Sequence, residues 1–387
     1  MKIVIAPDSF KGSLSAIEVS EAIAQGVKQV YSAAIVEKVP MADGGEGTVE
    51  CLVNATQGKI YQQEVIGPLG EPVLATFGIL GDEVTAVIEM ASASGLPLVL
   101  PEKKNPLITT TFGTGQLIKS ALDYGCRKMI IGIGGSATND GGAGMLQALG
   151  IHLFDENDKE IGFGGAQLSY LNRIDLSEID HRVKETSFLV ASDVQNPLCG
   201  PTGASNIYGP QKGATGEMVK ILDEALYHFA DVIKRDLGKD IKNVPGAGAA
   251  GGLGAGLMAF LNAELKPGID IVIDTVHLEQ KLKDANLVIT GEGEINGSTI
   301  YGKTPIGVAR IAKKYSIPVI SISALIDNSG WIVKEHGIDY LLKPENPPLH
   351  MEYPKSRKIE LIAKTIATFL IENVNLFCND RNKKNNH

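Results

Sequence analysis

The sequence predicts an α/β protein in which both ends of the chain form one doubly wound domain and the middle forms a second, inserted α/β domain. Three observations lead to this prediction. Short apolar runs alternate with helically spaced apolar residues near both chain ends. A stretch of β-rich segments without intervening helices follows the first of these regions. The chain also has 387 residues, whereas single cores stop growing at roughly 250–300 residues.

The first part of the chain is expected to begin with a β-α-β unit. Residues 3–6 form a short apolar run that suits a buried parallel strand. Ser15 is followed three residues later by Glu18, which is the pattern of a capping box, and apolar residues then keep helical spacing to Val30. A second strand is expected over residues 35–39.

The next elements are a glycine-rich loop, a helix and a β-meander. The loop covers residues 41–47, and the helix after it should run to about Thr56, with Gly58 as its C-terminal stop. Residues 59–90 contain three β-rich stretches separated by Gly-Pro and Gly-Asp turns, which predict a meander. The middle of the chain then carries most of the glycine and a long amphipathic helix over about residues 216–237.

Parallel α/β character returns near the C-terminus. Strands over residues 287–290 and 319–322 should flank a helix from Pro305 to about Tyr315, and a final helix should span about residues 356–372. The predicted domains follow from these patterns: residues 1–80 with 285–378 form the first domain, residues 81–284 form the inserted domain, and residues 379–387 form a disordered tail.

Composition excludes several classes of protein. The net charge of −9 argues against a nucleic-acid partner, which would require a basic surface. Four widely spaced cysteines, without a Cys-x-x-Cys pair, suggest neither a disulfide framework nor a zinc site: Cys51, Cys126, Cys199 and Cys378. The N-terminus enters a strand without a signal-peptide pattern, and no apolar run approaches the ~20 residues that span a bilayer. We therefore expect a soluble, cytoplasmic protein without a membrane partner.

Five polar, glycine-rich loops follow predicted strands or lie between apolar segments. They cover residues 7–13, 43–48, 132–142, 192–197 and 291–297. Small residues leave backbone N–H groups open to phosphate oxygens, carboxylates can hold Mg²⁺, and a lysine can neutralise transferred charge. Asp, Asn and Gly are also ordinary turn formers. Any one loop could be only a turn, but five together favour a phosphate-binding protein.

Two motif matches need their context. Residues 246–251 fit G-x-G-x-x-G, but no strand precedes them, so close packing before a helix over residues 251–261 is the better interpretation. Residues 297–304 fit the P-loop pattern, but they begin too far after the predicted strand for a true P-loop. Pro305 nevertheless suits the first turn of a helix, which places Lys303 and Thr304 at a helix N-terminus and so at an anion site.

Taken together, these segments resemble the bacterial glycerate kinase family, the type I, two-domain glycerate kinases. The stretches that carry the resemblance are residues 6–14, 40–48, 132–144, 193–197, 208–214, 245–257 and 303–308. The resemblance implies transfer of the ATP γ-phosphoryl group to glycerate with Mg²⁺. It also implies a flavodoxin-like domain built from both chain ends with a second α/β domain inserted. The partners would be glycerate and ATP, and a homodimer is one possible assembly.

The resemblance and the loop chemistry together give the candidate site residues. Lys11 and Lys303 are expected to bind phosphate charge, and Asp43 and Asp193 to bind Mg²⁺ or to accept the glycerate hydroxyl proton. The other candidates would bind substrate or nucleotide: Asp8, Ser9, Gly44, Gly45, Gly134, Gly135, Ser136, Asn139, Asp140, Asn196, Gly248, Gly252 and Glu292.

One loop departs from the family pattern. Where the family usually reads Gly-Glu-Gly-Arg-(Ile/Leu)-Asp, this chain has Glu294 and Asn296 in place of Arg and Asp. If the loop contacts an anionic substrate, Glu294 should weaken its binding or shift substrate choice; if the loop faces solvent, the change should be neutral. Three alternatives stay open: a kinase of another small hydroxy acid, a non-catalytic or regulatory relative, and a nicotinamide-linked oxidoreductase, which the lack of a strand-linked fingerprint disfavours.

Overall fold

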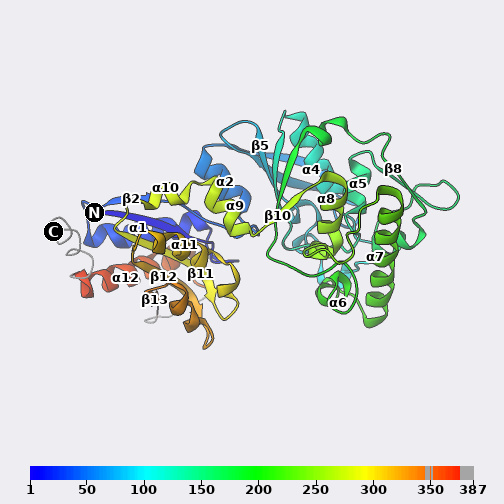
Figure 1. Ribbon diagram of the computed structural model, residues 1–387. Helices are drawn as coiled ribbons and strands as arrows, with labels where there is room; N and C mark the ends of the chain where they lie inside the picture. The colour runs from blue at the N-terminus through cyan, green and yellow to red at the C-terminus, as the bar shows by residue number, and fades with distance from the viewer. Residues whose placement is uncertain (345–348, 350–351, 375–387) are drawn as a thin grey trace. The chain divides into compact units, whose positions relative to one another are not determined.

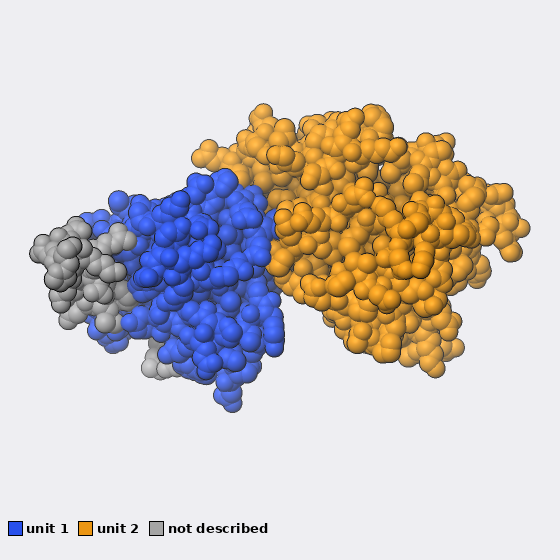
Figure 2. All heavy atoms as spheres, viewed as in Figure 1, with its two compact units in different colours: residues 1–43, 269–387 blue, residues 44–268 orange. Residues whose placement is uncertain are grey.

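A computed structural model describes residues 1–344, 349 and 352–374 of the chain. It divides into two compact units, shown in Figure 2. Unit 1 consists of residues 1–43 together with the described residues from 269 onward, and unit 2 consists of residues 44–268. Each unit has its own sheet, so the two are described separately.

Unit 1 is built on a parallel five-stranded sheet with the strand order β13-β12-β11-β1-β2 (Figure 1). Its strands are β1 (Lys2–Pro7), β2 (Ile35–Lys38), β11 (Leu287–Ile295), β12 (Val319–Ile326) and β13 (Tyr340–Leu342). β1 pairs in parallel with β11, with Ile3 opposite Leu287. Strands from the two ends of the chain are therefore neighbours in one sheet, and their apolar side chains form the buried core of this unit.

The helices of unit 1 are α1 (Ala16–Val30), α9 (Gly268–Thr275), α10 (Leu278–Leu282), α11 (Thr304–Lys314) and α12 (Lys355–Glu372). The predicted capping box opens α1: the Ser15 hydroxyl accepts a hydrogen bond from the Glu18 N–H, and the Glu18 carboxylate accepts one from the Ser15 N–H. α1 packs against α12, where a Cβ on Gly26 would lie 2.4 Å from the Ala363 carbonyl oxygen. Gly26 therefore permits close contact between helices from opposite ends of the chain.

Unit 2 contains a six-stranded sheet with the order β10-β9-β6-β5-β4-β3. Its strands are β3 (Lys59–Ile66), β4 (Pro72–Ile79), β5 (Thr85–Glu89), β6 (Lys128–Gly132), β9 (Ser187–Ala191) and β10 (Glu264–Lys266). The predicted meander is present as the antiparallel strands β3, β4 and β5, and the remaining pairings are parallel.

The unit boundaries differ from those expected from the sequence. Residues 44–80 were expected in the first domain, but β3 and β4 extend the sheet of unit 2, because β4 pairs with β5 and β5 pairs with β6. Residues 269–284 were expected in the inserted domain, but α10 packs on α11 and the structure groups them with unit 1. Pattern along the chain did not reveal which sheet the meander joins. The expected tail, residues 379–387, lies outside the described residues.

The helices of unit 2 are α2 (Thr48–Thr56), α3 (Ala91–Ser94), α4 (Phe112–Asp123), α5 (Ala143–Ala148), α6 (Ala204–Tyr208), α7 (Gly216–Leu237) and α8 (Leu253–Leu261). The long predicted helix is α7, with the expected bounds. α2 ends at Thr56 as expected, but the residue that takes the left-handed conformation after it is Gln57, with φ 58°, and not Gly58. Gly58 instead allows close packing, since a Cβ there would lie 2.1 Å from the Ile79 carbonyl oxygen.

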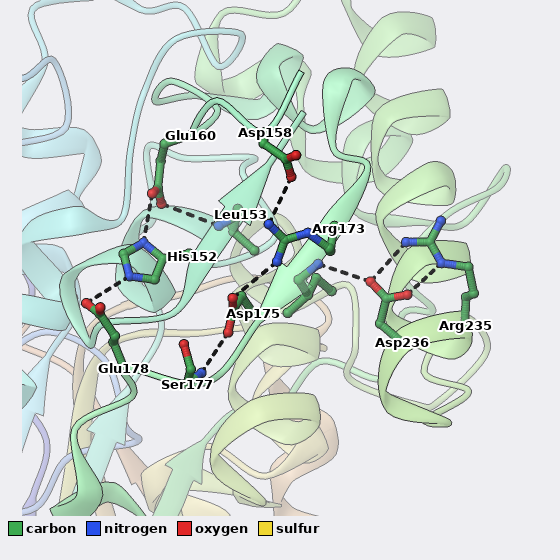
Figure 3. Close-up of polar contacts among 11 residues, drawn as sticks. His152, Leu153, Asp158, Glu160, Arg173, Asp175, Ser177, Glu178, Arg235 and Asp236 are labelled. Carbon is green, nitrogen blue, oxygen red and sulfur yellow. Dashed lines mark hydrogen bonds and ion pairs between the residues drawn. The ribbon is translucent and has the colours of Figure 1, made fainter. Parts of the chain in front are cut away.

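A small hairpin in unit 2, β7 (His152–Phe154) and β8 (Arg173–Asp175), carries a network of charged side chains (Figure 3). Both ring nitrogens of His152 contact carboxylates, Glu160 at 2.8 Å and Glu178 at 3.2 Å. These hydrogen bonds, that of Glu160 first, raise the pKa of His152 above its ordinary value. The hairpin is therefore held in part by a charge that depends on pH.

β11 is longer than the sequence suggested. It continues to Ile295, so most of the predicted loop over residues 291–297 is strand. A Cβ on Gly291 would lie 2.2 Å from the Ile322 carbonyl oxygen of β12, so the glycines here serve close strand packing. Across the described residues, every helix is too short or too polar to cross a membrane.

Candidate functional site

Unit 1 contains a cavity of about 490 Å³ at the carboxyl ends of β1, β11 and β12. The carboxyl ends of parallel strands are the usual ligand-binding edge of such sheets. Its lining residues are Asp8, Ser9, Phe10, Lys11, Ser13, Glu292, Gly293, Glu294, Lys303, Ala324, Leu325 and Leu349. Five of the predicted site residues, Asp8, Ser9, Lys11, Glu292 and Lys303, are among them.

Asp8 directly follows β1 and is almost fully buried. One carboxylate oxygen accepts a hydrogen bond from the Ser9 N–H at 2.6 Å, and the other accepts one from the Thr304 hydroxyl at 2.7 Å. Burial, and then the negative charge of Asp43, raises the pKa of Asp8 to about 7, against the opposing effect of the Thr304 hydrogen bond. Asp8 can therefore gain or lose a proton near neutral pH.

Two lysines form long ion pairs with carboxylates. The Lys11 ammonium lies 3.6 Å from Asp43, and the Lys303 ammonium lies 3.5 Å from Glu292. Burial alone would lower the pKa of Lys11, but the carboxylates of Asp43 and Asp8 raise it overall, so Lys11 is positively charged. Because neither lysine makes a short contact with its carboxylate, each can turn toward an anionic ligand at little cost.

The cavity also contains hydroxyl groups with no partner. The Oγ atoms of Ser9 and Ser13 are buried, and no group in the described part of the chain hydrogen-bonds to them. Buried polar atoms are usually satisfied, so unpaired ones beside a cavity suggest a missing ligand or water. Nearby, Lys303 is the N-cap of α11 and Thr304 is its first residue, which confirms the predicted helix N-terminus.

In unit 2, three predicted loops meet at the carboxyl ends of β6 and β9. Gly44, with φ 91°, lies so close to Ala191 that a Cβ would be 2.6 Å from that side chain. A Cβ on Gly132 would lie 2.4 Å from the Gly44 carbonyl oxygen, and one on Gly134 would lie 3.6 Å from Gly45. The predicted residues Gly44, Gly45 and Gly134 are therefore neighbours, and only glycine fits the closest of these contacts.

Asp193 follows β9 on the same sheet edge and is exposed. Its Oδ1 accepts a hydrogen bond from the Gly268 N–H at 3.2 Å, just after β10. Gly134 and Gly135 are exposed nearby in the chain, while Ser136 is buried. Asp193 is therefore placed where a side chain can reach a ligand.

Asp140 and Asn139 are completely buried. The Asp140 carboxylate accepts hydrogen bonds from both the N–H and the hydroxyl of Thr111 at 2.8 Å, and from the Gly142 N–H at 3.2 Å. The Asn139 amide donates to the Ser205 hydroxyl at 2.9 Å. These hydrogen bonds hold the loop together from inside.

Asn196, Gly248 and Gly252 lie in a second group of packed turns. The Asn196 carbonyl oxygen accepts a hydrogen bond from the Gly248 N–H at 3.0 Å, and its side-chain oxygen accepts one from the Tyr208 hydroxyl at 2.7 Å. A Cβ on Gly252 would lie 2.9 Å from the Cα of Gly141. The G-x-G-x-x-G segment therefore provides close packing ahead of α8, as the sequence interpretation favoured.

Sequence reasoning missed two charged residues, the half-buried Glu89 and the buried Lys212. Glu89 ends β5 and accepts a hydrogen bond from the Val49 N–H at 2.8 Å, in the first turn of α2. Its position directly after an apolar run was a usable signal. Lys212 is 1% exposed, and its ammonium donates to the Thr138 carbonyl at 2.5 Å. Burial lowers the pKa of Lys212 to about 7, against the charge of Asp140. Nothing in the local sequence marks a lysine as buried.

The predicted site residues divide between the two units. Unit 1 holds Asp8, Ser9, Lys11, Asp43, Glu292 and Lys303, and unit 2 holds Gly44, Gly45, Gly134, Gly135, Ser136, Asn139, Asp140, Asp193, Asn196, Gly248 and Gly252. The two predicted metal ligands, Asp43 and Asp193, belong to different units. In the described ranges, no three His, Cys, Asp or Glu side chains are grouped so that they could hold a metal ion.

Lysines, carboxylates and unpaired hydroxyls around a cavity at the carboxyl ends of parallel strands define an α/β enzyme that acts on an anionic ligand. Comparison with known proteins makes the class specific. Residues 3–371 match the model of the glycerate kinase family, so the chain belongs to the glycerate kinase family. Its members are kinases, which are enzymes that transfer a phosphoryl group.

Similar proteins cover nearly the whole chain. A glycerate kinase of Bacillus subtilis (strain 168) is 55% identical over 370 residues, which is 95% of this chain and 97% of the relative. A glycerate 2-kinase of Escherichia coli (strain K12) is 58% identical over 339 residues, 88% of this chain and 89% of the relative. A crystal structure assigned to glycerate kinase 2 of Salmonella typhimurium LT2 superposes with a TM-score of 0.89 at 50% identity and covers 97% of this chain and 98% of that one.

Proposed function

We propose that this chain catalyses ATP-dependent phosphorylation of glycerate. Family membership and the named relatives support the reaction, and the cavity in unit 1 supports it chemically. Phosphoryl transfer depends mainly on positioning and on neutralising the charge of the transferred group. The observation that carries the proposal is the pair of lysines, Lys11 and Lys303, each near a carboxylate but held loosely enough to turn to a phosphate.

The residue roles follow from this chemistry. Lys11 and Lys303 neutralise phosphate charge, and the N-terminus of α11 adds the N–H end of a helix. Asp193 is the candidate base for the glycerate hydroxyl, because it is an exposed carboxylate at the carboxyl end of β9. The exposed backbone at Gly134 and Gly135 can approach a ligand closely.

Mg²⁺ fits the residues of unit 1. Mg²⁺ needs only one or two protein carboxylates, since phosphate and water oxygens complete its shell. Burial, the Asp43 charge and the neighbouring acids raise the pKa of both Asp8 and Glu292, so this group of carboxylates would be stabilised by a cation. Asp8 and Asp43, whose charges act on each other, are the two carboxylates that would hold it, and when bound it would neutralise phosphate charge.

We also propose which phosphoglycerate is formed and which fold unit 1 has. The Escherichia coli relative is named a glycerate 2-kinase, which favours 2-phosphoglycerate as the product here. For unit 1 we propose the flavodoxin-like doubly wound arrangement. Numbered along the unit, its sheet has the order 2-1-3-4-5, which supports this assignment. A cytoplasmic location and a homodimer remain predictions.

A coupled assay tests the function. Purified protein with Mg-ATP and D-glycerate should form ADP and a phosphoglycerate, and separation of the 2- and 3-phosphate isomers identifies the product. The second candidate function is phosphorylation of another small hydroxy acid, because Glu294 replaces the usual arginine. Assays with a panel of related hydroxy acids distinguish this function from glycerate kinase activity. Absence of turnover on every acid would contradict the enzyme assignment and favour a non-catalytic relative.

A further inference from the structure

The cavity in unit 1 changes character along its two central strands. Glu292 and Glu294 are two residues apart on β11, so their side chains lie on the same face, and both line the cavity. In the parallel register, Glu292 pairs with Ser323 of β12 and Glu294 pairs with Leu325. The carboxylate of Glu294 therefore has an apolar neighbour, whereas Glu292 has the Lys303 ammonium at 3.5 Å.

One end of the cavity carries two lysines close to the carboxylates of Asp8 and Glu292. Lys11 and Lys303 lie on this side, together with the unpaired hydroxyls of Ser9 and Ser13. These groups are donors, and donors of this kind suit the oxygens of a polyphosphate. The hydroxyls of Ser9 and Ser13 are buried and have no hydrogen-bond partner in the described part of the chain, so a ligand in the cavity could supply one.

The opposite end of the cavity is apolar and is formed by residues of β12. Leu325 is a leucine with 54% of its surface exposed, and Ala324 precedes it on the cavity wall. Glu294 lies on β11, which is the strand between β12, where Leu325 lies, and β1, which leads to Lys11. It is exposed, and its carboxylate accepts a hydrogen bond from the Asn296 side chain at 3.3 Å, which orients it. The order across the sheet is therefore the lysines and hydroxyls, which lie among the carboxylates of Asp8 and Glu292, then Glu294, then the apolar wall.

A nucleotide has the matching sequence of groups. Its phosphates need donors, its ribose hydroxyls donate to a carboxylate as in other α/β folds, and its base packs on apolar side chains. The volume, about 490 Å³, lies within the usual range for a ligand of that size and is far larger than a three-carbon acid requires. Glycerate alone would leave the apolar wall unused.

We propose that the cavity of unit 1 is the nucleotide site, with the polyphosphate at Lys11 and Lys303, the ribose hydroxyls at Glu294, and the base against Leu325. The inference rests on the proposed kinase function, since it specifies where that enzyme holds ATP. It also gives a different meaning to the family departure at Glu294. This carboxylate acts on the nucleoside as a hydrogen-bond acceptor and does not repel the acid substrate.

Nucleotide binding tests the assignment without turnover. Calorimetric titration of ADP, 2′-deoxy-ADP and adenosine, with Mg²⁺ present, is compared among wild type, Leu325→Ser and Glu294→Ala. Both positions are exposed, so the variants should fold. The matched controls are Leu74→Ser and Glu64→Ala, an exposed pair aligned across β3 and β4 in unit 2.

We expect Leu325→Ser to weaken ADP and adenosine about tenfold, through lost apolar contact. Glu294→Ala should weaken the binding of ADP about tenfold but change the binding of 2′-deoxy-ADP by no more than about twofold. The reason is that 2′-deoxy-ADP lacks the 2′-hydroxyl, so it has no hydrogen bond from that group to the Glu294 carboxylate to lose. In steady-state assays the KM for ATP should rise in both variants, and the KM for glycerate should stay within about twofold.

Two results would overturn the assignment. One is unchanged ADP binding in both variants. The other is a lower KM for glycerate in Glu294→Ala with an unchanged KM for ATP, because that result would mean that Glu294 repels the acid substrate, as the sequence alone suggested. Failure of the proposed function looks different: the wild type would bind ADP with the variant pattern described here but phosphorylate no hydroxy acid. That outcome would leave the site assignment standing.

Discussion

Lys212 should make the stability of this protein depend on pH in a way that a single substitution removes. Its ammonium is buried in unit 2, and burial lowers its pKa to about 7, whereas an unfolded lysine has a pKa of about 10.4. Between these values the unfolded chain binds a proton that the folded chain does not, so stability rises with pH across this window. Below about pH 7 both states are protonated and this dependence ends.

The size of the effect follows from the shift. Each pH unit is worth about 1.4 kcal/mol, and a shift of about three units gives roughly 4–5 kcal/mol between pH 7 and pH 10.5. Lys212→Met removes this penalty but leaves the Thr138 carbonyl without its donor, which costs about 1–3 kcal/mol. The variant should therefore be more stable than wild type by about 1–4 kcal/mol at pH 7 and less stable by about 1–3 kcal/mol near pH 10.5.

Urea unfolding at several pH values measures this crossover. Circular dichroism should follow the transition, because the single tryptophan, Trp331, belongs to unit 1 and does not report directly on unit 2. Lys220→Met, an exposed lysine on α7, is the matched control and should show a small difference that does not vary with pH. A difference between wild type and Lys212→Met that stays constant from pH 7 to pH 10.5 would refute the reasoning, since Lys212 would then keep its charge throughout.

Three further predictions concern the site and the hairpin. Asp193→Asn should lower kcat about 100-fold or more while circular dichroism stays unchanged, if Asp193 is the base; retention of most activity would reduce it to a turn former. Asp8→Asn should raise the thermal unfolding midpoint most above pH 7, because the raised pKa of Asp8 makes its charged form costly in the folded state. The same difference in midpoint between variant and wild type at pH 5 and at pH 8 would argue against this. His152→Gln should lower the thermal unfolding midpoint more at pH 5.5 than at pH 8.5. The pKa of His152 is raised in the folded state, so its charge stabilises the fold below the unfolded pKa, and this stabilisation is lost as the pH rises through the folded pKa. A larger loss at pH 8.5 than at pH 5.5 would contradict a charged His152 between Glu160 and Glu178.

Elements with local signals were predictable from the sequence, and their assembly was less so. The capping box at Ser15 and the amphipathic period of α7 act within a few turns of helix, so α1 and α7 appear where expected. The membership of β3 and β4 depends on pairing with β5, which no local pattern specifies. For the same reason the unit boundary lies at Asp43 and not near residue 80.

The candidate site shows the same division. Polar residues after strands were a sound guide to Asp8 and Lys11, because strand ends define the ligand edge of a parallel sheet. The guide could not separate side chains that face a cavity from those that hold a loop from inside, as Asp140 does. Burial separates the two roles, and burial is set by the folded chain. Lys212 was missed for this reason.

The insertion of unit 2 within unit 1 has a consequence for synthesis on the ribosome. β1 and β2 emerge first, but β1 pairs with β11 through Ile3 and Leu287, so its partner is made some 280 residues later. At about 5–20 residues per second, that delay is roughly 15–60 s. Unit 2 is continuous from residue 44 to residue 268, and its two ends lie together, with a Cβ on Gly44 only 3.1 Å from Gly268. It can therefore fold during translation while β1, which can already pair with β2, waits for β11 on its other edge. That open edge exposes unpaired backbone groups to other chains until β11 is made.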